Sequence, residues 1–260
     1  MGLAKNSNTN KLKWVPKTLL CVSGSTFLVV TSTLSAAFAV DEYNPKDTEV
    51  WTPTPKEVKP YPFPSDAIVL FDGNNLDQWH GHKGPADWDV HNGITTIKPG
   101  ATGIATKEKF CDMQLHIEWR TPEKDPERSG QRQGNSGIYI QGKYELQVLD
   151  SYQNPTYVNG QAGSIYKQSI PLVNASLPPM QWQTYDVIYK APRFSDSGEL
   201  LEKANITVLH NGIVVQNNVE IQGRTQHKGP PYYEAHGCES IYIQNKNIKV
   251  SYRNIWARHL

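Results

Sequence analysis

Residues 138–150 read IYIQGKYELQVLD and contain two short runs separated by a Gly-Lys pair. In the second run, the Tyr, Leu and Val at positions 144, 146 and 148 share one face, and Glu145 and Gln147 share the other, because successive side chains of a strand point to opposite faces. Two such runs joined by a short glycine-containing turn predict neighbouring antiparallel strands.

Similar strand-like runs recur along the chain. They cover residues 68–71, 114–120, 185–189, 206–215, 241–243 and 250–256. The run 206–215 is interrupted by Asn211-Gly212, a strong hairpin signal because both residues tolerate positive φ. No stretch of 12 residues keeps a clean helical period. Short strands separated by frequent turns predict an all-β fold, a sandwich or a barrel.

Composition narrows the range of functions. The chain has 260 residues, 38% of them hydrophobic and 20% charged, with a net charge of +1. These values exclude collagen-like, acidic disordered and strongly basic nucleic-acid-binding chains. Residues 1–39 contain four lysines and no acidic residue, so the rest of the chain contains 22 basic and 25 acidic residues. A remainder with a charge of −3 does not favour binding to nucleic acid.

The N-terminal segment resembles an export signal. Lysines precede an apolar stretch over residues 18–30, and Ala37-Phe38-Ala39 provides an A-x-A cleavage site. We expect a signal peptide over 1–39, and a membrane helix is the alternative, although the run is short for a bilayer. Residues 41–64 contain six prolines, which predicts an extended linker over 40–64. The folded domain is then 65–260.

Export has two consequences for the mature protein. It is expected to be periplasmic or extracellular and not an integral membrane protein, since no second long apolar run exists. Its two cysteines, Cys111 and Cys238, would meet an oxidising compartment. They pair there or remain separate buried thiols, and the spacing does not distinguish these alternatives.

The polar face of the run 144–148 is a candidate site. It is either solvent-exposed surface or a concave binding face that presents Glu145 and Gln147. A bulge would bring Asp150 to the same face, where two carboxylates suit acid–base or glycosidase chemistry. The layout resembles the E-x-D-x-x-E of laminarinase-type glycosidases, but Gln147 replaces the central acid.

Four further places hold candidate residues. Glu118 and Arg120 alternate with apolar residues, and they form a surface ion pair or hold sugar hydroxyls. Asn135 lies in the Gly-flanked turn 134–137, which either presents backbone N–H groups to a ligand or is a turn without a binding role. Tyr166 and Lys167 are candidates for proton transfer or oxyanion stabilisation. His227 lies in a Pro-rich loop, where a single His is either catalytic or an ordinary loop residue.

Taken together, these segments resemble a known family. The matching segments, in chain order, are Phe71-Asp72-Gly73, Gly134-Asn135-Ser136-Gly137-Ile138-Tyr139, Tyr144-Glu145-Leu146-Gln147-Val148-Leu149-Asp150-Ser151, Gly163-Ser164-Ile165-Tyr166-Lys167, Trp182-Gln183-Thr184-Tyr185-Asp186, Val208-Leu209-His210-Asn211-Gly212 and Tyr252-Arg253-Asn254-Ile255-Trp256. In order and spacing they resemble the bacterial 3-keto-disaccharide hydrolases over nearly all of 65–260. The resemblance implies a concanavalin A-like jelly-roll sandwich of two antiparallel sheets.

The resemblance also implies an activity. Exported members of this family act on glycosides already oxidised to a ketone at C3, which implies a functional link to a sugar 3-dehydrogenase. A base removes the acidified C2 proton, the C1 substituent leaves by β-elimination, and water adds back. Such an enzyme needs a base, an enolate stabiliser and an acid.

The expected roles follow from this chemistry. Glu145 is the expected base, and Tyr166, Lys167 and His227 are candidates for the stabiliser and the acid. The residues expected to bind substrate are Glu118, Arg120, Asn135, Gln147, Asp150 and Gln244. Relatives tend to follow the equivalent of Gln244 with Asp-His-Gly, whereas residues 245–247 here are Asn-Lys-Asn. No cofactor is implied; a divalent metal is compatible with the cleft, but no ligand set requires one.

Three alternatives remain open. One is a non-catalytic carbohydrate-binding module of the same fold, held by aromatic residues such as Trp88 and Tyr166. Another is a laminarinase-like endo-glycosidase, disfavoured by Gln147 in place of the central acid. The third is a cell-surface interaction protein that uses the Pro-rich segment as a spacer.

Overall fold

The computed structural model describes residues 44–50 and 52–260. The signal peptide predicted over 1–39 lies outside these residues. Within the described part of the predicted linker 40–64, the regular structure is one 3₁₀ turn, η1 (Pro45–Thr48). Residues Lys56–Leu260 form one compact unit. In the described ranges, no helix is long and apolar enough to cross a membrane.

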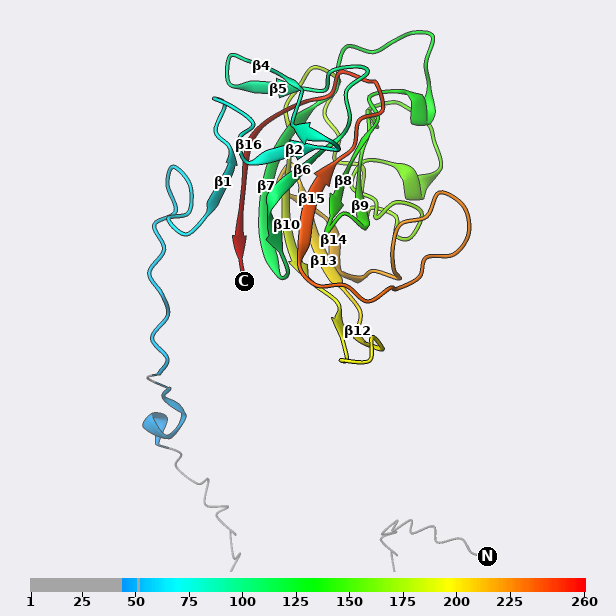
Figure 1. Ribbon diagram of the computed structural model, residues 1–260. Helices are drawn as coiled ribbons and strands as arrows, with labels where there is room; N and C mark the ends of the chain where they lie inside the picture. The colour runs from blue at the N-terminus through cyan, green and yellow to red at the C-terminus, as the bar shows by residue number, and fades with distance from the viewer. Residues whose placement is uncertain (1–43, 51) are drawn as a thin grey trace, which may run out of the picture. The chain divides into compact units, whose positions relative to one another are not determined.

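The compact unit is built on two antiparallel sheets (Figure 1). The eight-stranded sheet has the order β14 (Ile213–Glu220), β13 (Asn205–His210), β10 (Gln183–Lys190), β7 (Met113–Arg120), β16 (Ser251–His259), β5 (Ile94–Thr96) and β4 (Asp89–His91), with β1 (Ile68–Phe71) paired to β16. The six-stranded sheet has the order β3 (Gly84–Pro85), β2 (Trp79–Gly81), β6 (Ile104–Phe110), β15 (Glu239–Ile243), β8 (Ser136–Ile140) and β9 (Tyr144–Val148).

Smaller elements lie in the connections. Strands β11 (Arg193–Phe194) and β12 (Leu200–Glu202) form a separate two-stranded ribbon. Two 3₁₀ turns, η2 (Gly130–Arg132) and η3 (Val158–Gly160), lie in the segments before β8 and after β9.

The core lies between the two sheets because each contributes one apolar face. Leu115 and Ile117 of β7 belong to the same buried cluster as Ile138 of β8 and Leu146 of β9. Strand β7 alternates buried and half-buried residues over its whole length, as a strand with one face in the core should. The predicted all-β jelly-roll sandwich of two antiparallel sheets is confirmed.

The sequence signals for individual strands also hold. Residues 68–71 form β1, and the run 138–150 forms the antiparallel pair β8–β9. Strands β13 and β14 pair across Asn211-Gly212, whose φ angles of 53° and 78° are the left-handed values that this tight turn requires.

The open question about the cysteines is answered by a disulfide between Cys111 and Cys238. Cys111 directly follows β6, and Cys238 directly precedes β15, so the bond joins the ends of two paired strands. It also fixes the C-terminal end of the long connection from β14 to β15, which holds Thr225 and His227.

Candidate active site

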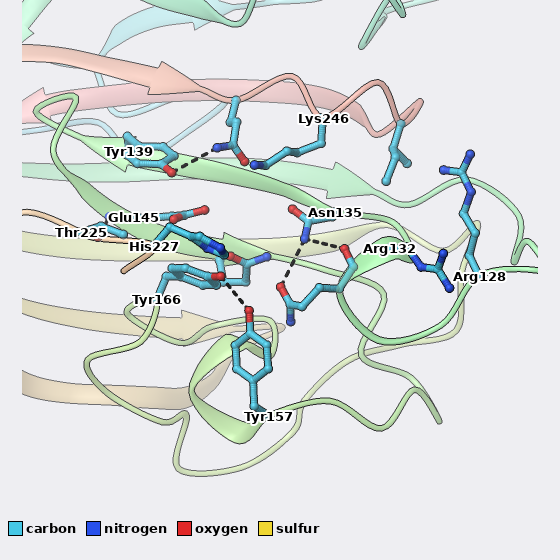
Figure 2. Close-up of a pocket in the computed structure, with 14 residues that line it drawn as sticks. Arg128, Arg132, Asn135, Tyr139, Glu145, Tyr157, Tyr166, Thr225, His227 and Lys246 are labelled. Atoms are coloured by element: carbon cyan, nitrogen blue, oxygen red, sulfur yellow. Dashed lines mark hydrogen bonds between the residues drawn. The ribbon is translucent and has the colours of Figure 1, made fainter. Parts of the chain in front are cut away.

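A cavity of about 640 Å³ opens beside β8 and β9 (Figure 2). It is lined by side chains of these two strands, of the segment that follows β15, and of three loops. The lining residues are Arg128, Gln131, Arg132, Asn135, Tyr139, Glu145, Gln147, Tyr157, Tyr166, Thr225, His227, Gln244, Lys246 and Ile248. A concave site with several convergent polar groups is the usual form of a small-molecule site.

Glu145 reaches this cavity through the alternation of β9. Its neighbours Tyr144 and Leu146 belong to the core, so the strand turns Glu145 toward the opposite face. The backbone N–H of Glu145 donates to Oγ1 of Thr225 (2.9 Å), and its carbonyl accepts the N–H of Tyr166 (3.0 Å). Two loops are thereby hydrogen-bonded to the strand at the residue that carries the carboxylate.

The carboxyl group of Glu145 is strongly perturbed. The residue is 4% exposed, and this burial raises its pKa from 4.5 to about 7, although Tyr139 and the positive charge of Lys246 act in the opposite direction. A carboxyl group with this pKa is partly ionised at neutral pH and can take up or release a proton there.

A glycine makes room for this carboxyl group. Gly137 of β8 lies two residues along the strand from Tyr139, the residue that pairs with Glu145. A Cβ at Gly137 would collide with Oε1 of Glu145 and would lie 3.0 Å from its Cγ. The Glu145 side chain therefore occupies space that any larger residue at position 137 would take.

Side-chain amides line the cavity beside the carboxylate. Gln244 donates from Nε2 to the hydroxyl of Tyr139 (3.1 Å), and Asn135 donates from Nδ2 to the carbonyl of Gln131 (2.8 Å). The Oε1 atoms of Gln147 and Gln244 are buried and have no partner among the described residues. Buried acceptors are normally satisfied, so these two oxygens are exceptions within the wall of the cavity.

Tyr166 lies in the loop after β9, at the same end of the cavity as Glu145, and its side chain points toward Tyr157 (Figure 2). Its hydroxyl forms a 2.6 Å hydrogen bond with the hydroxyl of Tyr157. Burial raises the pKa of Tyr166, so the phenol remains neutral and can donate a hydrogen bond. A neutral hydroxyl of this kind suits an oxyanion or a leaving oxygen.

The structure brings six of the ten predicted site residues to one cavity: Asn135, Glu145, Gln147, Tyr166, His227 and Gln244. His227 is exposed at the cavity edge. Four predicted residues do not line the cavity: Glu118, Arg120, Asp150 and Lys167.

Lys167 supports the site from outside. Its Nζ donates to the backbone carbonyl of His227 (2.7 Å) and lies 5.7 Å from the ring centroids of Tyr157 and Tyr166. It therefore links the Tyr166 loop to the His227 loop. Backbone φ at Lys167 is 60°, which turns its side chain away from the course of a regular strand.

Glu118 and Arg120 lie on β7, in the other sheet. Glu118 accepts from Nε of Arg253 (2.6 Å) and Nδ2 of Asn254 (2.8 Å). The guanidinium of Arg120 lies 4.8 Å from the centroid of the Trp182 ring. Polar and apolar residues alternate along β7 as they do along β9. The polar face of β7 belongs to the eight-stranded sheet, however, and does not contribute to the cavity.

Asp150 is not returned to the cavity by a bulge. It is 3% exposed, and its Oδ1 accepts the N–H of Tyr152 (3.2 Å). Of the described residues that line the cavity, Glu145 is the single carboxylate. The carboxylate pair needed by a laminarinase-like mechanism is therefore not assembled here.

The aromatic residue suggested for a binding module has a different place. Trp88 is 5% exposed, and its Nε1 donates to the carbonyl of Thr102 (2.9 Å). It belongs to the core cluster, so it offers no flat surface to a sugar.

Sequence reasoning missed several residues that line the cavity: Arg128, Gln131, Arg132, Tyr139, Tyr157, Thr225, Lys246 and Ile248. Tyr139 could have been found, because it alternates with two core isoleucines and pairs with Glu145. Lys246 lies in the Asn-Lys-Asn departure, so the deviation itself was the signal. The arginines lie in a loop without periodicity.

The described residues contain no group of three or more His, Cys, Asp or Glu side chains that could hold a metal ion. That a divalent metal is compatible with the cleft stays a prediction from the sequence.

Solved structures share the fold. A crystal structure from Parabacteroides distasonis ATCC 8503, provisionally described as a glycosyl hydrolase, is 46% identical with a TM-score of 0.80, over 84% of this chain and 97% of that one. Two others from the same organism, with the same provisional description, are 19% and 18% identical with TM-scores of 0.55 and 0.50, each over 75% of this chain and over 94% and 99% of its own length.

No curated protein matches this sequence. A family match nevertheless covers most of the compact unit. Residues 66–258 match the family described as the 3-keto-alpha-glucoside-1,2-lyase-like domain. This span includes every residue that lines the cavity, and it agrees with the family resemblance seen in the sequence. The chain therefore belongs to the 3-keto-alpha-glucoside-1,2-lyase-like family.

Proposed function

We propose that this protein cleaves glycosides whose sugar carries a ketone at C3. The family and the 46% identical glycosyl hydrolase-like structure support an enzyme that acts on glycosides. The single observation that carries the proposal is Glu145, a buried carboxyl group with a pKa of about 7 in a cavity of polar groups. That is the pKa of an effective general base at neutral pH.

The reaction proceeds in two stages. Glu145 removes the proton from C2, which the C3 ketone has acidified, and the electron pair moves into an enolate. The enolate then expels the C1 substituent: the C1–O bond breaks, and the leaving oxygen keeps the electron pair and takes a proton. Water next adds across the C1=C2 bond, with oxygen at C1 and hydrogen at C2, so the net change is hydrolysis.

The enolate oxygen needs a stabilising donor. The neutral hydroxyl of Tyr166 and the ammonium group of Lys246 are the candidates, since both line the same cavity as Glu145. The sequence suggested Lys167 as the cation for this role. Because the Nζ of Lys167 is hydrogen-bonded to the carbonyl of His227 and Lys167 does not line the cavity, Lys246 is the candidate instead. A cation or hydroxyl that is already positioned stabilises charge that develops in the transition state.

The remaining polar groups bind the sugar and serve the leaving group. His227, at the cavity edge, is the candidate acid for the departing oxygen. The side-chain amides of Asn135, Gln147 and Gln244, which line the cavity, are the candidates to hold hydroxyl groups. The substrate must be supplied by an enzyme that oxidises a glycoside at C3, the reaction class of a sugar 3-dehydrogenase.

Export is a second part of this proposal. The disulfide between Cys111 and Cys238 supports an oxidising compartment, periplasmic or extracellular, in agreement with the A-x-A site at residues 37–39. The N-terminal residue of the protein purified from its native cells tests this. A mature chain that begins at Val40 supports export, and an intact N-terminus in the cytoplasmic fraction contradicts it.

Replacement of the base tests the catalytic role. Glu145→Gln keeps the shape of the side chain but removes its basicity, so turnover of a 3-keto-glycoside should fall by about 10²- to 10⁴-fold while binding remains. The charge-matched control is Glu220→Gln, since Glu220 is exposed on β14 in the other sheet. Unchanged turnover in Glu145→Gln would refute the assignment, and binding without turnover in the unaltered protein would favour a carbohydrate-binding module.

A further inference from the structure

Positive charge gathers at one end of the cavity. Figure 2 shows Arg128 and Arg132 together at the end away from Glu145, Tyr166 and His227. Both arginines belong to the loop between β7 and β8, and Arg132 is the last residue of η2. The cavity thus combines a reacting end, with its single carboxylate, and a cationic end.

The cationic end is only partly neutralised by the residues around it. Nε of Arg128 pairs with Asp125 (2.9 Å), whereas no ion pair of Arg132 is found among the described residues. The neighbouring acid Glu127 is exposed and does not line the cavity. Arg132 therefore presents a full, unpaired guanidinium group at this end.

The loop that carries the arginines is held by hydrogen bonds on several sides. The N–H of Gly130 donates to Oδ1 of Asn154 (2.7 Å), and Nε2 of Gln131 donates to the carbonyl of Gly160 (2.7 Å). The side-chain amide of Gln133 exchanges two hydrogen bonds with the backbone of Asp125 (3.0 and 3.3 Å). These bonds hold the loop that carries the two arginines, so less loop entropy is lost when a ligand binds there.

We propose that Arg128 and Arg132 form an oxyanion subsite, and that the leaving group of the substrate carries a carboxylate there. This inference rests on the proposed function, because the reaction at Glu145 defines which part of the substrate lies at the far end. Guanidinium groups present paired N–H donors that match a carboxylate, and a cavity of about 640 Å³ is large enough for a ligand longer than one sugar. The substrate class is then a 3-keto-glycoside with an acidic second unit, such as a uronic acid.

Matched substrates test the subsite. Two 3-keto-glucosides are compared, one with glucuronate as the leaving unit and one with its neutral methyl ester. The unaltered protein should show a kcat/KM about 10- to 100-fold higher for the acid, as expected for hydrogen bonds to a charged group. In Arg132→Gln this preference should collapse toward unity. Lys124→Gln, a charge change in the same loop outside the cavity, should keep the preference.

A binding measurement separates this inference from the proposed function. Calorimetry of Glu145→Gln with the same acid and ester should show preference for the acid, which the additional Arg132→Gln change removes. Turnover without any preference for the acid, in kinetics and in binding, overturns the subsite and leaves the proposed function intact. Preferential binding of the acid without turnover of either substrate supports the subsite and overturns the proposed function. If a substrate with a sulfated leaving unit is preferred over the neutral ester as strongly as the carboxylate is, the subsite accepts oxyanions in general.

Discussion

Glu145 shows how one carboxyl group can be made reactive by its position. Its pKa rises from 4.5 to about 7 because burial disfavours the charged form more than Tyr139 and Lys246 favour it. The folded protein therefore binds this proton more tightly than the unfolded chain does. Ionisation of Glu145 consequently opposes folding, and the cost grows as the pH rises from about 4.5 to about 7.

Stability should therefore respond to Glu145 in a pH-dependent way. Glu145→Gln should have little effect on the free energy of unfolding at pH 4, where the carboxyl group is protonated. At pH 8 it should raise that free energy by up to about 3 kcal/mol, since one pKa unit corresponds to about 1.4 kcal/mol. Denaturant unfolding at the two pH values measures this. Equal effects at pH 4 and pH 8 would show that the pKa of Glu145 is not raised.

At the scale of single strands, β8 and β9 act together to place the carboxylate. Gly137→Ala adds a Cβ that collides with the Glu145 carboxylate. The backbone at Gly137 lies outside the left-handed region, so this collision, and not backbone strain, is the expected effect of the substitution. The collision displaces the Glu145 carboxylate from the position in which it reaches the substrate. A displacement of about 1 Å in a catalytic group can lower the rate about 10²-fold, so kcat/KM should fall by about that factor. Steady-state kinetics measures the loss.

Gly84→Ala is the matched control for this change. No atom lies within 4 Å of a Cβ placed at Gly84, which belongs to β3 at the edge of the same sheet. Its activity should equal that of the unaltered protein. If Gly137→Ala is as active as Gly84→Ala, the position of the Glu145 carboxylate is not what limits the reaction.

The strands show what the sequence can and cannot predict. Alternation correctly indicated which side chains of β9 leave the core, and Asn211-Gly212 correctly indicated a hairpin. The same alternation in β7 suggested that Glu118 and Arg120 bind substrate. Whether a polar face becomes a cavity depends on the loops that cover it, and loop positions follow from tertiary contacts that have no periodic signal.

On the scale of the whole molecule, the disulfide joins residues 127 positions apart. A bond that closes so long a loop restricts the unfolded chain strongly. Replacing Cys111 and Cys238 together by serine should lower the free energy of unfolding by about 2–5 kcal/mol. Denaturant unfolding with and without reductant measures this, and reductant should not affect the double variant. Equal stability of the oxidised protein and the double variant would contradict a stabilising role.

The site itself joins distant parts of the chain. Residues from the β7–β8 loop, from β9 and from the loop before β15 meet at one cavity, and the disulfide holds the end of the last of these loops. Of the six predicted residues that line the cavity, Asn135, Glu145, Gln147 and Tyr166 lie in segments that match a known family. His227 and Gln244 lie outside these segments and were predicted from their residue types and neighbouring sequence. Arg128 and Arg132 could not be predicted, because their relation to Glu145 exists only in the folded chain.

The central claim is that cleavage begins with removal of the C2 proton by Glu145. The most direct test is NMR of a 3-keto-disaccharide incubated with the protein in D2O. The account predicts bond cleavage with deuterium at C2 of the released 3-keto sugar, and neither cleavage nor exchange with Glu145→Gln. Cleavage that leaves hydrogen at C2 would contradict elimination and would indicate direct hydrolysis at C1.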